Sequence, residues 1–196
     1  MTVADASPRP PVPVEFAAAV ADLTALTPRA EVSVRRVNSP QRLAPWAYAM
    51  AVEVEGAPVS ATGRLVLLYD PDGQEGWHGR FRFAALAAVD IDPEIGWDPM
   101  LAGVTWSWLV DALALRGAEA TAIGGTVTQT ASTRFGALAG PGGDELDEPT
   151  VELEVQLRGS WTPVGDDFAA HALGFADLLC TAAGLPPEGV AGLPGR

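Results

Sequence analysis

An alternation of apolar and polar residues constrains the fold of this chain more than any other feature. Residues 150–161, TVELEVQLRGSW, place Val151, Leu153, Val155 and Leu157 at every second position, with charged or polar residues between them. Successive side chains of a β-strand point to opposite faces of its sheet, so this pattern predicts a strand with one buried face. Further strands are predicted at 31–37, 46–56, 61–70, 80–91 and 120–136.

Three segments have helical character instead: 14–26, 98–116 and 166–181. The resulting order is helix, four strands, helix, two strands, helix. The links between strands are short, which favours antiparallel neighbours. The 196 residues suit one domain. We therefore predict a single α+β domain, with one antiparallel sheet of about six strands packed against about three helices.

Proline, glycine and polar residues mark the ends of this domain. Residues 1–13 are proline-rich and are expected to be disordered, and 185–196 form a proline- and glycine-rich tail that we expect to be flexible. The folded domain should span 14–184. Within it, 137–149, ALAGPGGDELDEP, is predicted to be a mobile loop.

The charge balance excludes several classes of function. The net charge is −13 and the twelve basic residues are all arginine. Such a chain is repelled by phosphate backbones and anionic lipid, so nucleic-acid or membrane binding is not expected. Because the chain has no lysine, it cannot bind phosphate through a phosphate-binding-loop lysine, and it cannot be an enzyme that forms a Schiff base through a lysine. We expect no cofactor.

Cysteine usage and the N-terminus indicate a cytoplasmic protein. Cys180 is the single cysteine, so an intramolecular disulfide and a cysteine-based metal cluster are both excluded. The first residues, MTVADASPRP, lack the basic and apolar regions of a secretion signal. No apolar run reaches the length of about 18 residues that a membrane span needs.

The middle helix is apolar nearly all round. We expect Asp98 to cap it, Pro99 to open it and Gly117 to end it. Trp106 and Trp108 stand about 200° apart on such a helix. We predict two apolar stripes: Leu101, Val104, Trp108 and Leu115, and Gly103, Trp106, Val110 and Leu113.

One of these stripes should lie on the sheet. The other would meet the terminal helices or, in a homodimer, a second copy of the chain. The residues that we assign to an interface are Trp106, Trp108, Val110 and Leu113.

Few residues offer chemistry, and we predict no catalytic residue. His78 lies in a glycine-rich turn, where it is either an ordinary solvated side chain or, with Arg80, Arg82 and Arg134, part of an anion pocket. His171 falls on the last helix and is expected to be packed and hydrogen-bonded. No GxSxG pattern supports a serine nucleophile.

Four carboxylates lie close together in DIDPEIGWD: Asp90, Asp92, Glu94 and Asp98. Clustered carboxylates can hold Mg²⁺ or Ca²⁺, but this segment lacks the ligand periodicity of a calcium-binding loop. Helix capping and turn formation explain Asp92 and Asp98 without a metal, so we predict no metal site.

The segment 77–83, WHGRFRF, mixes arginine with aromatic residues, as RNA-binding sheets do. Arg64 and Arg158 would join Arg80 and Arg82 on the outer face of the sheet. Glu53, Glu152 and Glu154 are expected on that face as well, so cross-strand ion pairing is the favoured interpretation.

Several stretches resemble an actinobacterial family of uncharacterised proteins: VEFAAAVADL, LYDPDGQEGWHGRFR, DPMLAGVTWSWLVDAL, GTVTQTASTRFG, RGSWTP and LCTAAGLPPEGV. The resemblance covers roughly residues 12–190 and implies a cytoplasmic protein without assigned catalytic residues. Its members are often encoded near a ribonuclease-D-like exonuclease, which points to RNA metabolism. The order of elements is also similar to that of type III secretion chaperones, which are small acidic homodimers that bind protein segments.

We therefore expect a protein-interaction or regulatory, chaperone-like protein, and we do not expect an enzyme. It would bind a protein partner, and a homodimer is a further expectation. Two alternatives stay open. One is a small-molecule (anion) binding protein or small enzyme, and the other is an accessory protein in RNA processing.

Overall fold

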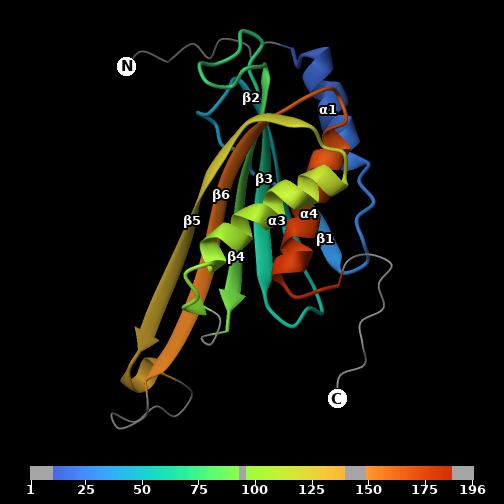
Figure 1. Cartoon of the computed structure of the whole chain (residues 1–196). Coiled ribbons are helices and arrows are strands. Elements are labelled where there is room, and N and C mark those ends of the chain that lie inside the picture. Colours follow the sequence, from blue (N-terminus) through green and yellow to red (C-terminus); the bar gives the residue numbers. More distant parts are fainter. Residues whose placement is uncertain (1–10, 93–95, 140–148, 187–196) are drawn as a thin grey trace, which may run out of the picture.

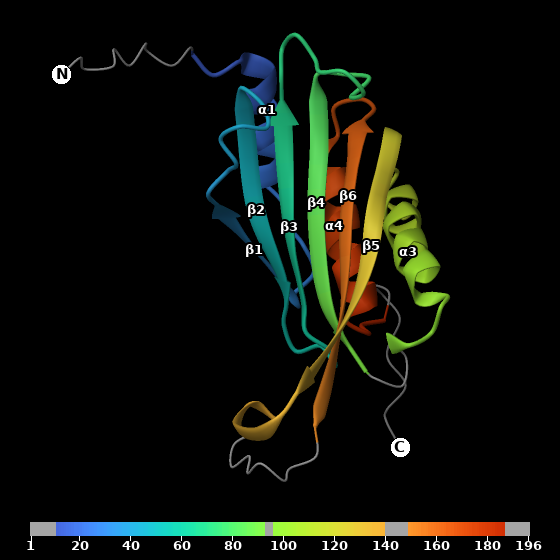
Figure 2. The ribbon, with the colours of Figure 1, turned by 90° about the vertical axis from the view of Figure 1, so that its left-hand side faces the viewer.

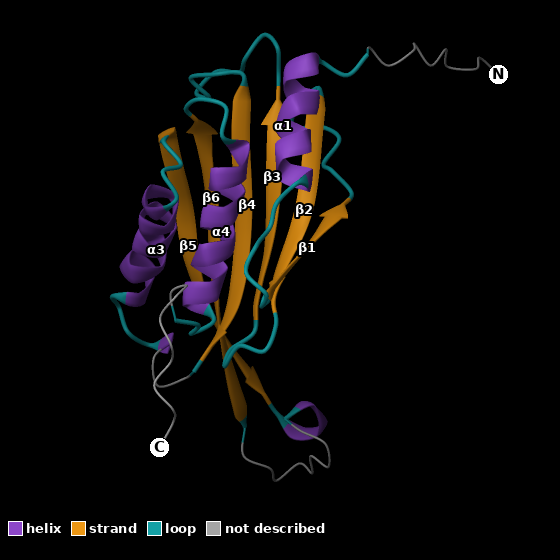
Figure 3. Cartoon of the chain, turned by 90° about the vertical axis from the view of Figure 1, so that its right-hand side faces the viewer, coloured by secondary structure: helices purple, strands orange, loops and turns teal. Residues whose placement is uncertain are grey.

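Six antiparallel strands form one sheet, and the helices cover one of its faces (Figures 1 and 3). The computed structural model describes residues 11–92, 96–139 and 149–186. The strands are β1 (Val32–Val37), β2 (Trp46–Val54), β3 (Ala61–Tyr69), β4 (Phe81–Ile91), β5 (Ala120–Arg134) and β6 (Thr150–Pro163). The helices are α1 (Val14–Thr24), α3 (Leu101–Leu115) and α4 (Phe168–Ala182), with a short 3₁₀ helix at Gly136–Leu138. The predicted fold class and order of elements are confirmed.

The strands lie in the order β1-β2-β3-β4-β6-β5. The chain leaves β4, forms α3 and re-enters the sheet at its far edge as β5, before β6 returns between β4 and β5. The pairing of β4 with β6 ends at Ile91 and Leu153, whereas β5 and β6 stay paired to Arg134 and Thr150. The β5–β6 hairpin therefore continues beyond the sheet as a two-stranded arm (Figure 2).

The main core lies between the sheet and the helices. Side chains at alternate strand positions, such as Met50, Leu65 and Leu157, are buried on this inner face. Helix α4 packs closely on β3 because Gly63 has no side chain. A Cβ atom at Gly63 would lie 2.6 Å from the Cζ atom of Phe175. The small residue thus fixes the distance between the helix and the sheet.

His171 is buried in this core, as predicted. Its Nδ1 atom accepts a hydrogen bond from the indole N–H of Trp161 over 3.1 Å, and its ring centroid lies 5.3 Å from that of Phe83. The side chain of Asp167 caps α4 by accepting a hydrogen bond from the N–H of Ala170 over 3.0 Å. Asp167 is therefore the residue that caps the N-terminus of α4.

The outer face has a small core of its own at one end. Ala49, Val66 and Leu68 are buried there, packed against Trp77 and Ala44. Trp77 and Ala44 belong to the β3–β4 and β1–β2 connections, which fold over the sheet. No helix formed by the described residues lies on the rest of the outer face (Figure 2).

Helix α3 differs from its prediction at the N-terminus and in its buried stripe. It begins at Leu101 rather than Pro99, because the carboxylate of Asp98 accepts from the N–H of Met100 over 2.8 Å and forms a turn before the helix. The buried side chains are Leu101, Thr105, Leu109, Ala112 and Leu113. The predicted stripes were wrong because they placed neither Thr105 nor Leu109 in the core.

Within the described residues, no helix has the length and apolar character that crossing a lipid bilayer requires. Residues 1–10, 93–95, 140–148 and 187–196 lie outside the described part of the chain. Most of the predicted tails, 1–13 and 185–196, and most of the predicted mobile loop at 137–149 fall in these ranges.

Candidate protein-interaction surface

The C-terminus of α3 turns sharply toward the edge of the sheet. Gly117 has φ of +67°, its N–H donates to the carbonyl of Ala114 over 3.0 Å, and the N–H of Ala118 donates to the carbonyl of Leu113 over 2.9 Å. This is a Schellman motif, and it confirms that Gly117 ends the helix. Two residues later the chain enters β5, so α3 and the start of β5 form two sides of a corner.

An apolar hollow of about 590 Å³ lies in this corner. Helix α3 contributes one wall, β5 another, and Val164 at the end of β6 closes the base. The N–H of Val164 donates to the carbonyl of Glu119 over 2.9 Å, which ties the base to the corner. The lining residues are Val110, Leu113, Ala114, Gly117, Ala118, Glu119, Ala120, Ile123 and Val164. Glu119 is the one charged side chain in this set.

A β-bulge places Ile123 at the hollow. The register of β5 against β6 shifts between Thr121 and Gly124, and Ala122 adopts φ of +48°. A bulge inserts one residue and re-aims the side chains beside it. Ile123 remains 37% exposed. Ile123 was not among the predicted site residues, although the adjacent glycines in a predicted strand are a signal for a bulge.

The two tryptophans of α3 are covered by different parts of the chain. Trp106 lies over Gly125 of β5, where a Cβ atom would be 2.8 Å from its ring. Trp108 lines a second hollow of about 470 Å³ on the other side of α3, together with Arg29, Cys180 and Leu185. Both indoles are half-buried within the chain.

The predicted interface residues therefore divide into covered and open positions. Leu113 is buried against α4, where a Cβ atom at Gly174 would lie 3.1 Å from its Cδ2 atom, and it also lines the apolar hollow. Val110 is 39% exposed and lines the apolar hollow. Leu115 is 86% exposed on the opposite side of the helix.

The predicted anion-binding residues do not share one pocket. His78 and Arg80 line a hollow of about 680 Å³ beside α1. Arg80 is not part of β4, and its Nη1 atom forms an ion pair with Glu15 over 2.7 Å. The hydroxyl of Tyr69 also donates to Glu15, over 2.9 Å. These two donors hold the pKa of Glu15 below its usual value, the tyrosine being the stronger cause.

Three carboxylate side chains, from Glu15, Asp22 and Asp166, line this same hollow. Their negative charge opposes the binding of an anion. His78 has φ of +60°, a left-handed conformation that histidine adopts more readily than most residues. His78 is therefore an exposed residue of the turn between β3 and β4.

Arg82 and Arg134 lie elsewhere. Arg82 is on the outer face, where it donates to the hydroxyls of Ser160 over 2.8 Å and Thr162 over 3.1 Å. Burial lowers its pKa. Arg134 is at the far end of β5 and pairs with Glu152 over 2.5 Å. Arg82 and Arg134 are therefore at different positions on the sheet, and neither lines the hollow that contains His78 and Arg80.

The outer face carries Arg64, Arg82 and Arg158 as expected, but Arg80 pairs with Glu15 of α1 instead, and of the aromatic residues in 77–83 only Trp77 packs on that face. Arg64 and Arg158 flank Leu86 in the strand register, on the face that also holds Arg82. Phe81 and Phe83 point to the helices instead, where Phe83 is fully buried. Their rings therefore cannot stack on RNA bases.

The predicted cross-strand ion pairing is present in part. Arg35 on β1 pairs with Glu53 on β2 over 3.0 Å.

The four carboxylates of the acidic segment lie at the end of β4 and before α3. Asp90 and Asp92 are on either side of Ile91, the last residue of β4, and Asp98 caps the turn before α3. Glu94 lies outside the described residues. No group of three or more potential metal-ligating side chains gathers among the described residues.

A family model described as "Protein of unknown function (DUF3000)" matches residues 12–191. The chain belongs to the DUF3000 family. Neither the comparison with curated proteins nor that with solved structures found a match to the chain. For a DUF3000 protein, the surfaces described above are therefore the basis for proposing a function.

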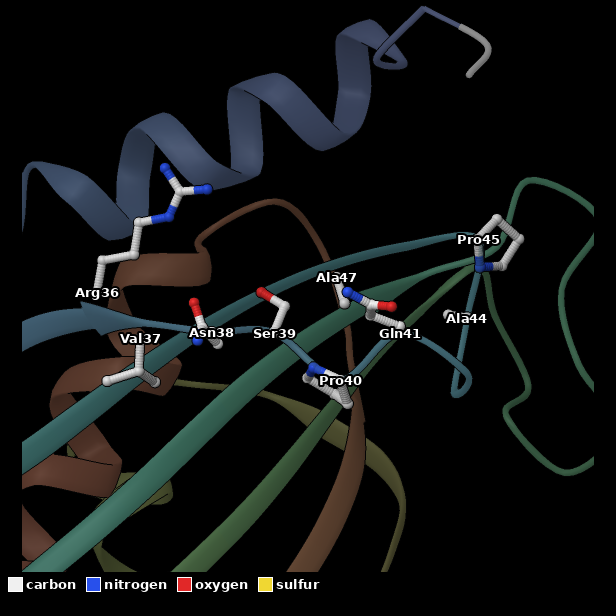
Figure 4. A pocket seen from close by; sticks show the side chains of 9 residues that line it. All are labelled: Arg36, Val37, Asn38, Ser39, Pro40, Gln41, Ala44, Pro45 and Ala47. Atoms are coloured by element: carbon white, nitrogen blue, oxygen red, sulfur yellow. The ribbon is translucent and has the colours of Figure 1, made fainter. Parts of the chain in front are cut away.

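A further hollow of this DUF3000 structure, of about 690 Å³, lies at the connection between β1 and β2 (Figure 4). It is bounded by the connecting segment from Asn38 to Pro45. Arg36 extends from it toward the helix side, where its Cζ atom lies 5.6 Å from the centre of the Tyr48 ring. The other residues of its lining are uncharged and include no histidine or carboxylate that would act as a general acid or base.

Proposed function

We propose that this chain is a non-catalytic protein-interaction module that binds an extended segment of a partner protein at the α3–β5 surface. The observation that carries the proposal is the apolar hollow beside the outermost strand. Val110 and Ile123 remain partly exposed there, although both are large and apolar. Exposed apolar surface next to a strand edge is typical of a docking site.

The neighbouring strand indicates an extended occupant. β5 is the last strand in the sheet order, so one of its edges has no neighbouring strand within the described residues. From Ala120 to Thr133 it contains no charged residue and no proline. Edge strands usually carry such residues to prevent pairing with other chains. A segment that adds to this edge would gain backbone hydrogen bonds, and its apolar side chains would enter the hollow.

The test is a selection of linear peptides from a random library on the full chain. We expect the selected peptides to carry alternating apolar residues. Their binding should fall about tenfold or more in Val110→Asp and Ile123→Asp, because a buried carboxylate costs more than a kcal/mol. Hydrogen exchange of the bound complex should show protection of β5 amides.

Leu115→Asp is the matched control, because Leu115 lies on the same helix but faces away from the hollow. It should bind the peptides like the wild type, and thermal unfolding should confirm that all three variants are folded. Peptides that bind Ile123→Asp as tightly as wild type, or that protect amides outside β5 only, would overturn the proposal.

A further inference from the structure

Charged side chains on the outer face of the sheet form two bands. The basic band holds Arg64 on β3 and Arg158 on β6, which flank Leu86 on β4 in the strand register. The acidic band holds Asp90 on β4 and Glu154 on β6, which are directly opposite each other in the register. All four charged side chains are exposed.

Neither band is neutralised within the described part of the chain. Arg158, Asp90 and Glu154 form no ion pair there. Arg64 donates only to the backbone carbonyl of Asn38. Like charges directly opposite each other on neighbouring strands destabilise a sheet. Asp90 and Glu154 therefore carry a local cost that an external cation would relieve.

The two bands are spaced regularly. Arg158 and Glu154 are four residues apart on one strand, which corresponds to about 13 Å. Gln156 lies midway between them, and it pairs in register with Ala88 of β4. On β6, Arg158 and Glu154 are therefore at equal distances from the row of Gln156 and Ala88 and carry opposite charges, whereas Arg64 and Asp90 lie on the neighbouring strands β3 and β4.

We propose that the outer face binds a second copy of this chain, face to face and with the strands antiparallel. The two-fold axis lies between the two sheets, perpendicular to the strands, and passes over Gln156 and Ala88. It places Arg158 against the partner's Glu154, and the same contact occurs a second time by symmetry. Arg64 is then one strand away from the partner's Asp90, within reach of its long side chain.

The residues around the bands suit such a contact. Ala88 lies between the bands, Ala51 and Leu86 lie in the row of the basic band, and all three are apolar. A hollow of about 280 Å³ lies over Leu86 between Arg64 and Arg158. Two sheets pack about 10 Å apart when their inner side chains interdigitate. Small residues let the longer arginine and glutamine side chains occupy this space.

The projecting arm gives a second reason for a second copy. Phe135 and Leu138 at its end are 67% and 75% exposed, and a two-stranded hairpin is marginally stable alone. The arm continues from the acidic end of the face. In the antiparallel arrangement, the basic end of the partner and its β1–β2 and β3–β4 connections lie beside it.

The experiment measures the mass of the full chain by sedimentation equilibrium. We expect the wild type to form a dimer of the 20.3 kDa chain that weakens with added salt. Arg158→Glu and Glu154→Arg should each raise the dimer dissociation constant about tenfold or more, because each brings like charges together. Asp22→Arg, an exposed charge reversal on α1, should leave the dimer unchanged.

Mixing the two variants is the decisive measurement. A heterodimer of Arg158→Glu with Glu154→Arg has opposite charges at both symmetric contacts, so mixing should restore association. Circular dichroism of each variant alone checks that it is folded. A monomeric wild type at about 100 μM, which is a weak-binding limit, would overturn the proposal. So would a dimer that neither substitution weakens, or weakened variants that do not associate when mixed.

Discussion

The indole N–H of Trp161 donates a hydrogen bond to His171, and burial in the core favours the uncharged form of this histidine. Burial lowers the pKa of His171 from 6.5 to about 4, and the charge of Asp167 opposes this only in part. In the unfolded chain the imidazole takes up a proton near pH 6.5. The unfolded state therefore binds more protons than the folded state between these two values.

The free energy of unfolding should consequently fall as the pH drops from about 6.5 to about 4. Above and below this window His171 should have no effect on the slope. The shift corresponds to about 3 kcal/mol. His171→Gln, which keeps an acceptor for Trp161 but does not titrate, should lose this part of the dependence. Urea unfolding at several pH values measures it, and an equal slope in both proteins would contradict the assignment.

Gly125→Ala should destabilise the chain by about 2 kcal/mol, because the new methyl group would meet the ring of Trp106 and the carbonyl of Arg158. The tryptophan emission should also change as the ring is displaced. Gly124→Ala is the control, since a Cβ atom there meets nothing within 4 Å. Equal unfolding free energies for the two variants would show that Trp106 does not depend on Gly125.

Ala122→Gly should stabilise the protein by about 1 kcal/mol, because alanine at φ of +48° is strained and glycine is not. Chemical unfolding measures the gain. Ala131→Gly lies in a regular part of the same strand and should instead lose stability. A loss at both positions would mean that the bulge at Ala122 carries no strain.

The ion pair between Arg116 and Asp177 should contribute about 1 kcal/mol by joining α3 to α4. Its two hydrogen bonds, of 2.5 and 2.9 Å, form a bidentate contact, and the side chains are 29% and 27% exposed. Asp177→Asn should show this loss in thermal unfolding, and high salt should reduce it. Glu53→Gln removes a more exposed pair and should have almost no effect. If both changes cost the same, the bidentate geometry adds nothing.

Much of the fold could be predicted because strand periodicity is local. Residues 150–161 show which side chains face the core without knowledge of any neighbour, and the cap at Asp167 and stop at Gly117 rest on nearby hydrogen bonds. Helix α3 could not be oriented in this way. Most of its residues are apolar, so its periodicity does not distinguish Leu109, which is buried, from Leu115, which is exposed.

The candidate site depends on contacts between distant residues, which periodicity does not encode. Arg80 looked like a neighbour of Arg82 on one strand face, but its partner is Glu15, far away in sequence. The apolar hollow requires both the bulge at Ala122 and the turn after α3, and neither feature alone would form it. Val110 could be predicted as an interface residue because it lies on an apolar helix. Ile123 could not, because its position depends on the bulge in β5.

The small second core on the outer face affects β3 most. From Leu65 to Tyr69 every side chain is buried, because the helices cover one set and the two connections cover the other. This half-strand is shielded from water on both sides, and it has β2 and β4 along its two edges. Its amide protons should therefore be among the last to exchange with deuterated solvent, and their exchange should report on the opening of the whole domain.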